Sequence, residues 1–150
     1  MPPEIWFYHL ERAGIEAVLP PLLEKTLERG WRALVRTTSK ERVAALDDAL
    51  WSFRDDAFLP HGRADHADAE LQPILISERD DGPNKPDALF LIDGAEPGEI
   101  DALSRVVLLF DGHDETAVAS ARARWSAYKE QGIAIASWQQ GADGRWEKKV

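Results

Sequence analysis

Short runs of apolar residues alternate along the chain with longer segments whose apolar positions recur every three or four residues. The short runs have the length of buried strands, and the longer segments have the spacing of one helical face. The expected strands are residues 5–10, 31–37, 73–77, 88–92, 106–110 and 133–138. The expected helices are residues 15–30, 40–53 and 113–131, with a helical turn or short helix at residues 98–103.

Residues that start and stop helices refine this pattern. Pro20 and Pro21 are best placed in the first turn of their helix, where missing N–H groups matter least. A hydroxyl of Thr38 or Ser39 is expected to cap the next helix, and Gly30 and Gly132 are natural stops. Residues 63–72 lack any period and are expected to form a loop, and residues 145–150 a tail.

Strands that alternate with helices predict an α/β fold in which a mostly parallel sheet is covered on both faces. The expected architecture is a three-layer, Rossmann-like sandwich. The chain has 150 residues, close to the usual size of one domain, and it contains no repeat, linker or shift in composition. We therefore expect residues 1–150 to form a single domain.

Composition removes several classes of function. The chain has no cysteine, which excludes disulfides, thiolate zinc sites and cysteine nucleophiles. Its net charge of -9 opposes the phosphate backbone, so nucleic acid is expected to be reached only through a protein partner. No signal peptide or membrane-spanning run is present in the sequence, so we expect a cytoplasmic protein without membrane contact.

No motif predicts a cofactor or a catalytic residue. The sequence lacks G-x-G-x-x-G, G-x-x-x-x-G-K-S/T and G-x-S-x-G, and the prolines of the Gly82–Pro86 segment remove donors that a phosphate loop needs. Possible metal ligands gather in one short segment, at His61, Asp65, His66 and Asp68. Because nothing in the spacing fixes their geometry, a solvated loop is favoured, and no metal is expected.

One candidate binding surface surrounds Trp51. The apolar stripe of the second helix consists of Val43, Leu46, Leu50 and Phe53, and Trp51 lies to one side of it. An exposed Trp51 next to Phe58, Leu59 and Pro60 would form an apolar patch typical of a partner site. Periodicity leaves open the alternative that Trp51 covers the edge of the core and Phe58 is buried.

A second candidate surface lies on the last helix. Arg122, Trp125 and Lys129 share one face, and Tyr128 is next to Trp125. Cations beside aromatic rings fit an acidic peptide that carries an aromatic residue. Periodicity alone favours an amphipathic helix with a core Trp and solvated cations.

Several segments, in order along nearly the whole chain, resemble the chi subunit of bacterial DNA polymerase III holoenzyme, a clamp-loader accessory protein. The most specific of these segments is LDDALWSFRDDAFLPHG, at residues 46–62. The other matching segments are IWFYHL, ERGWRALVRT, PILIS, the N-x-x-D-x-L-F-L-I run at residues 84–92, and ARARWSAYKEQGIAIASWQQ.

The resemblance implies a non-catalytic adaptor without cofactors on a Rossmann-like sandwich. Such subunits bind the psi subunit of the clamp loader and the acidic, Phe-terminated tail of single-stranded DNA-binding protein. By position, Trp51 and Phe58 match residues used toward psi or a competing helicase, with Leu59 and Pro60 beside them. Arg122 and Trp125 match positions used for the tail, and Tyr128 and Lys129 are expected to complete that pocket.

The chain departs from the family pattern near the expected tail site. Val118 and Ser126 stand where basic residues are familiar, and Trp125 replaces a tyrosine. A less basic pocket predicts weaker tail binding. Two alternatives remain, a small Rossmann-like enzyme and a degenerate nucleotide-binding regulator. Both require a polar pocket at the carboxyl ends of the strands.

Overall fold

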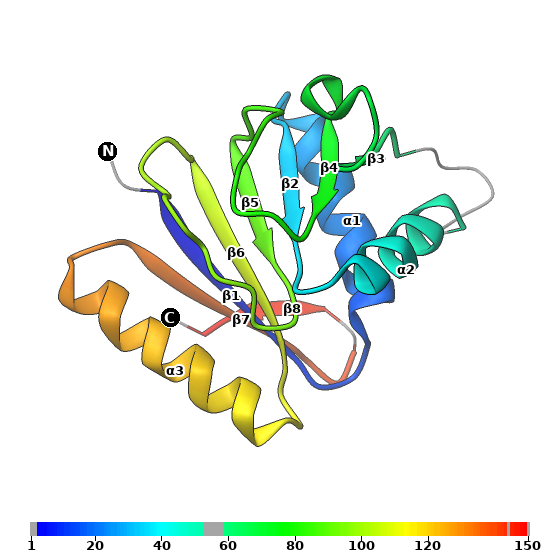
Figure 1. The fold of residues 1–150 in the computed structure, drawn as a ribbon. Helices are drawn as coiled ribbons and strands as arrows, with labels where there is room; N and C mark the ends of the chain where they lie inside the picture. Colours follow the sequence, from blue (N-terminus) through cyan, green and yellow to red (C-terminus); the bar gives the residue numbers. More distant parts are fainter. Residues whose placement is uncertain (1–2, 53–58, 144, 150) are drawn as a thin grey trace.

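The computed structural model describes residues 3–52, 59–143 and 145–149, which form one α/β sandwich (Figure 1). The helices are α1 (Ile15–Glu28), α2 (Lys40–Trp51) and α3 (Glu115–Glu130), with a 3-10 turn, η1, at Ala69–Leu71. The strands are β1 (Glu4–Leu10), β2 (Ala33–Arg36), β3 (Gly62–Arg63), β4 (Ile74–Ser77), β5 (Ala88–Leu91), β6 (Arg105–Asp111), β7 (Ile135–Gln140) and β8 (Trp146–Lys148).

These strands form one sheet in the order β3-β4-β2-β5-β6-β1-β7-β8. Neighbours are parallel except for β7 and β8, which are antiparallel. The helices lie on both sides of it, α1 and α2 on one face and α3 on the other (Figure 1). This arrangement confirms the predicted fold class of a three-layer sandwich with a mostly parallel sheet.

The alternation of side chains along each strand divides the core into two layers. In β1, Tyr8 and Leu10 join the cluster under α1 and α2, whereas Ile5 and Phe7 join the cluster under α3. Each helix contributes its apolar stripe to its own layer. For α2 this stripe is Val43, Leu46 and Leu50, as the spacing predicted, and the predicted fourth member, Phe53, lies outside the described residues. The helical layers therefore present separate outer surfaces.

Most predicted elements are present with bounds shifted by a few residues, and the Ser39 side chain caps α2 by accepting from the Arg42 amide. The expected placement of Pro20 and Pro21 was wrong. Because α1 begins at Ile15, both prolines lie in its second turn, where Glu16 and Ala17 lose their usual amide donors. Pro20 is buried in the core, and this burial offsets the lost hydrogen bond.

Three segments differ from the sequence prediction. Residues 63–72 are not all loop, because Gly62–Arg63 pairs with β4 and Ala69–Leu71 forms a 3-10 turn. Residues 98–103 contain only a turn, in which the Leu103 amide donates to the Ile100 carbonyl. The expected tail contains β8, which pairs with β7 and packs Trp146 against Tyr8. Within the described residues, no helix is long and apolar enough to cross a membrane.

Candidate binding surfaces

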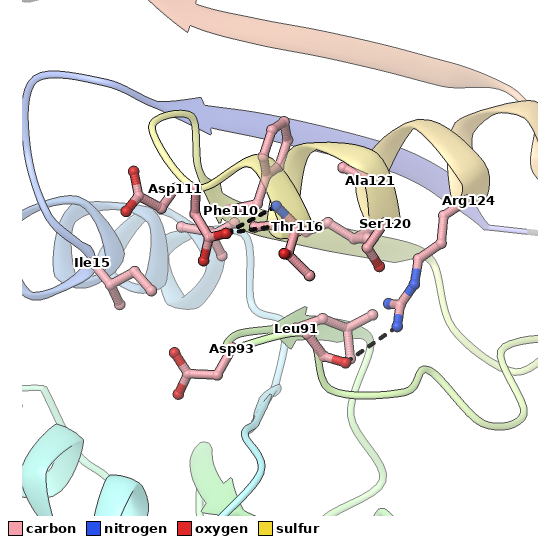
Figure 2. Close-up of a pocket in the computed structure, with 14 residues that line it drawn as sticks. Ile15, Leu91, Asp93, Phe110, Asp111, Thr116, Ser120, Ala121 and Arg124 are labelled. Atoms are coloured by element: carbon pink, nitrogen blue, oxygen red, sulfur yellow. Dashed lines mark hydrogen bonds between the residues drawn. The ribbon is translucent and has the colours of Figure 1, made fainter.

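A cavity of about 420 Å³ lies at the carboxyl ends of β5 and β6, beside the first half of α3 (Figure 2). Folds of this class usually bind their ligands at this edge of the sheet. Leu91, Leu108 and Phe110 give the cavity an apolar floor. Its charged lining consists of the carboxylates Asp93, Asp111 and Asp114 and the guanidinium of Arg124.

The amino end of α3 opens onto this cavity, but two of its amide donors are already used. The Asp114 side chain accepts from the amides of Thr116 and Ala117, at 3.0 and 3.3 Å. Dashed lines beside Thr116 in Figure 2 mark these hydrogen bonds. A phosphate at this position would meet a carboxylate in place of free N–H groups. The helix end is therefore unsuited to a nucleotide.

Arg124, the one cation among the described residues that line the cavity, already has hydrogen-bond partners within the chain. The guanidinium of Arg124 donates to the carbonyls of Ala95 at 2.9 Å and Gly94 at 3.3 Å, and lies 3.6 Å from Glu96. These contacts hold α3 against the loop that follows β5 (Figure 2). A ligand phosphate would have to displace them and approach three carboxylates. The geometry therefore disfavours both the nucleotide-binding regulator and a phosphate-dependent enzyme.

An ion-pair network joins the loops around the same edge of the sheet. Arg42 contacts Glu16 at 2.8 Å and Asp93 at 2.9 Å, and Asp93 accepts from the Thr37 hydroxyl. The hydrogen bond from Arg42 lowers the pKa of Glu16. Asp93 has a positive φ of 58°, a conformation that Asp tolerates better than most residues. The network fixes the starts of α1 and α2 against the loop after β5.

The candidate metal ligands do not converge. His61 is buried and lies 3.1 Å from Asp47, whereas His66 is exposed and contacts Asp65 at 3.7 Å. Among the described residues, no three histidine or carboxylate side chains are placed to hold an ion. The structure thus gives no support to a metal centre in this segment and separates His61 from the other candidates.

The first predicted surface lies at the end of α2. Trp51 is 55% exposed, the first of the two alternatives that periodicity left open. Leu59 is only 3% exposed and belongs to the core under α2, so it supports this surface from below. Pro60 is half-buried, and Phe58 lies outside the described residues. Sequence reasoning missed the role of His61, whose ring lies 4.4 Å from that of Trp51.

The second predicted surface lies on α3, in the opposite helical layer. Arg122 and Lys129 are exposed, and Trp125 is half-buried with its ring 5.2 Å from Phe7. Tyr128 is 7% exposed and belongs to the core, where burial raises its pKa. Arg122, Trp125 and Lys129 therefore share the outer part of the helix, and Tyr128 lies beneath them.

The two cations of this surface are free to bind a ligand, unlike several arginines of the sandwich. Arg42, Arg63, Arg105 and Arg124 all contact a carboxylate. Within the part of the chain that the structure describes, Arg122 and Lys129 have no hydrogen-bonded or ionic partner. Two unpaired cations next to a half-buried indole supply the groups that an anion with an aromatic ring requires of a binding site.

Comparison with known proteins identifies the family. The sequence profile of the family described as "DNA polymerase III chi subunit, HolC" matches residues 2–136. The chain belongs to the DNA polymerase III chi subunit family. The members of this family are accessory subunits of the replicative polymerase.

Two members of the chi family illustrate the similarity. The DNA polymerase III subunit chi of Pseudomonas aeruginosa is 33% identical over 115 residues, which cover 76% of this chain and 78% of that protein. The probable DNA polymerase III subunit chi of Rickettsia prowazekii is 23% identical over 103 residues. That match covers 69% of this chain and 62% of the Rickettsia protein, less than two thirds of its length.

Proposed function

We propose that the chain is a non-catalytic adaptor of the DNA polymerase III clamp loader. In this role it binds the psi subunit through the surface around Trp51. Through α3 it binds the acidic C-terminal tail of single-stranded DNA-binding protein. The protein thus reaches nucleic acid only indirectly, as its acidic composition requires.

The observation that carries the proposal is the pair of unpaired cations on α3. Arg122 and Lys129 lie about two turns apart on a face that also carries, between them, the half-buried ring of Trp125. An acidic tail provides carboxylates for the cations, and its terminal Phe provides a ring to pack against the indole. Because the whole chain has a net charge of -9, this local pairing must outweigh a general repulsion.

The Trp51 surface supports the second contact. A tryptophan that is 55% exposed is unusual, and exposed aromatic residues often dominate the energy of protein interfaces. Trp51 and α3 lie in different helical layers, so two partners can bind at once. In the proposed role Phe58 and Pro60 extend this surface. A helicase that competes for Trp51 would bind the same residues as psi.

The cavity at the sheet edge supports a non-catalytic role. Its amide donors and its arginine are used within the chain, and three carboxylates line it. Neither a phosphate nor an oxyanion finds a preformed donor pair there. The lining of this cavity therefore favours the adaptor role over an enzyme or a nucleotide-dependent regulator that would use this edge of the sheet.

Calorimetry with two peptides tests the proposal. One peptide has an acidic sequence that ends in Phe, and the other lacks the Phe. We expect the first to bind the wild type and to bind Arg122→Ala at least several-fold more weakly. The second is expected to bind both proteins weakly. Lys40→Ala, which removes an exposed cation on α2, is the matched control for net charge. Equal binding in all combinations contradicts the tail site.

A further inference from the structure

A buried histidine lies beneath the exposed indole of Trp51. The side chain of His61 is fully shielded from solvent, although its neighbour Trp51 is 55% exposed. Their ring centroids are 4.4 Å apart, and their planes are tilted by 47°. The imidazole of His61 therefore packs directly beneath the indole of Trp51.

The imidazole is itself anchored on two sides. Its Nε2 atom lies 3.1 Å from the Asp47 carboxylate, one turn before Trp51 on α2. Its Nδ1 atom contacts the carbonyl oxygen of Leu59, a residue buried in the core. Both ring nitrogens thus face oxygen acceptors on fixed elements. The orientation of the imidazole follows from the fold and does not depend on Trp51.

We propose that His61 is a positioning residue that holds the indole of Trp51 in one orientation for its partner. This inference rests on the proposed function, in which the partner is the psi subunit. A side chain that is ordered before binding loses less conformational entropy in the complex. A fixed indole also presents the same outline to every approaching partner, which favours a complementary pocket.

Spectra of the free protein test the positioning without any partner. Incorporation of 5-fluorotryptophan gives a fluorine signal for each Trp, and Trp51→Phe assigns that of Trp51. In His61→Gln we expect the Trp51 signal to move toward that of a solvated tryptophan, with the other signals unchanged. His66→Gln is the matched control, because its side chain is 62% exposed in the same segment. It should leave all signals in place.

A second variant keeps the test decisive if His61→Gln does not fold. Asp47→Ala removes the carboxylate acceptor of Nε2, leaves the Asp47 carbonyl oxygen at 3.3 Å, and places a good helix former on α2. We expect a smaller shift of the Trp51 signal in the same direction. A folded His61→Gln or Asp47→Ala protein with an unchanged Trp51 signal overturns the proposal.

Binding measurements connect the positioning to function. The affinity for the psi subunit of the same organism should fall about threefold to tenfold in His61→Gln, as expected for one side chain that must be ordered on binding. The affinity for the acidic tail peptide should not change. Unchanged affinity for psi overturns the role of His61 in binding. If Trp51→Ala binds psi like the wild type, the proposed partner is wrong, and the fluorine spectra alone then decide whether His61 orients Trp51.

Discussion

The indole of Trp125 on α3 packs against the ring of Phe7 on β1, with 5.2 Å between the ring centroids and a tilt of 58°. One face of this side chain thus belongs to the core, and the rest belongs to the proposed tail surface. Substitutions at Trp125 therefore combine an effect on folding with an effect on binding, and the two need separate measurements.

Truncation of Trp125 is expected to destabilise the protein moderately. Removal of a fully buried Trp typically destabilises by ~3–5 kcal/mol, and because Trp125 is half-buried we expect about 2 kcal/mol for Trp125→Ala. Trp125→Phe keeps a ring against Phe7 and should lose less. Urea denaturation measures both values. Wild-type stability in Trp125→Ala would show that the contact with Phe7 contributes nothing.

Binding of the acidic tail peptide should weaken as salt concentration rises. Arg122 and Lys129 are exposed, and charges at the surface are screened over about 8 Å at physiological ionic strength. The salt dependence should be smaller in Arg122→Ala, since one of the two pairing cations is gone. Calorimetry at several salt concentrations measures both slopes. Identical slopes for wild type and variant would place the tail elsewhere.

The N-cap of α3 should contribute measurably to stability. Asp114→Ala removes the acceptor for the Thr116 and Ala117 amides, and the loss of such a cap destabilises by about 1 kcal/mol. Asp114→Asn keeps a capping oxygen and should lose less. Thermal unfolding of the three proteins gives the comparison. Equal unfolding of wild type and Asp114→Ala would mean that the cap is replaced by water.

Both tyrosines of the chain should resist ionisation until the protein unfolds. Burial raises the pKa of Tyr8 to about 12, although Arg105 opposes the effect, and burial also raises the pKa of Tyr128. Between pH 10 and 12 the folded state therefore keeps a proton on Tyr8 that the unfolded state loses. Stability must fall as pH rises through this window, by about 2–3 kcal/mol for Tyr8.

Tyrosinate absorbance during an alkaline titration checks this expectation, because the chain contains only two tyrosines. The absorbance should rise together with the loss of folded structure by circular dichroism. A rise near pH 10 in a protein that remains folded would show that Tyr8 or Tyr128 is accessible to solvent.

Wild-type protein is expected to show no thermal stabilisation by ATP or NAD. Asp114 occupies the amide donors at the end of α3, and the guanidinium of Arg124 is held by carbonyl groups. A ligand at a hundredfold excess over its dissociation constant would stabilise by about 2.7 kcal/mol. A melting experiment easily detects a change of that size, and its presence would contradict the adaptor role.

Sequence periodicity predicted the sheet and the three helices because buried strands and amphipathic helices leave strong local patterns. Trp51 was predicted beside the stripe of α2, and the structure confirms its exposure. The short strands β3 and β8 have no such pattern, since they exist only through pairing with β4 and β7. Their prediction requires knowledge of which strands become neighbours.

For the candidate surfaces, too, the sequence predicted local features but not contacts between distant segments. Spacing predicted that Arg122, Trp125 and Lys129 share a helical face, a local property. The burial of Tyr128 and Leu59 and the contact between His61 and Trp51 depend on packing between distant segments. His61 was considered as a metal ligand, because Asp65, His66 and Asp68 follow it within seven residues. The motif that includes it gave no sign that its ring would meet α2.

Both ends of the sheet finish in very short strands, β3 with two residues and β8 with three. An open strand edge can pair with the same edge of another molecule and begin aggregation. Here β8 covers the outer edge of β7, and it offers only a brief ladder that carries Glu147 and Lys148. Lys148 lies directly opposite Trp138 in this ladder and places a charge beside its indole. The strand β8 therefore opposes self-association by sheet extension at this edge. It lies beyond residue 136, where the family match ends.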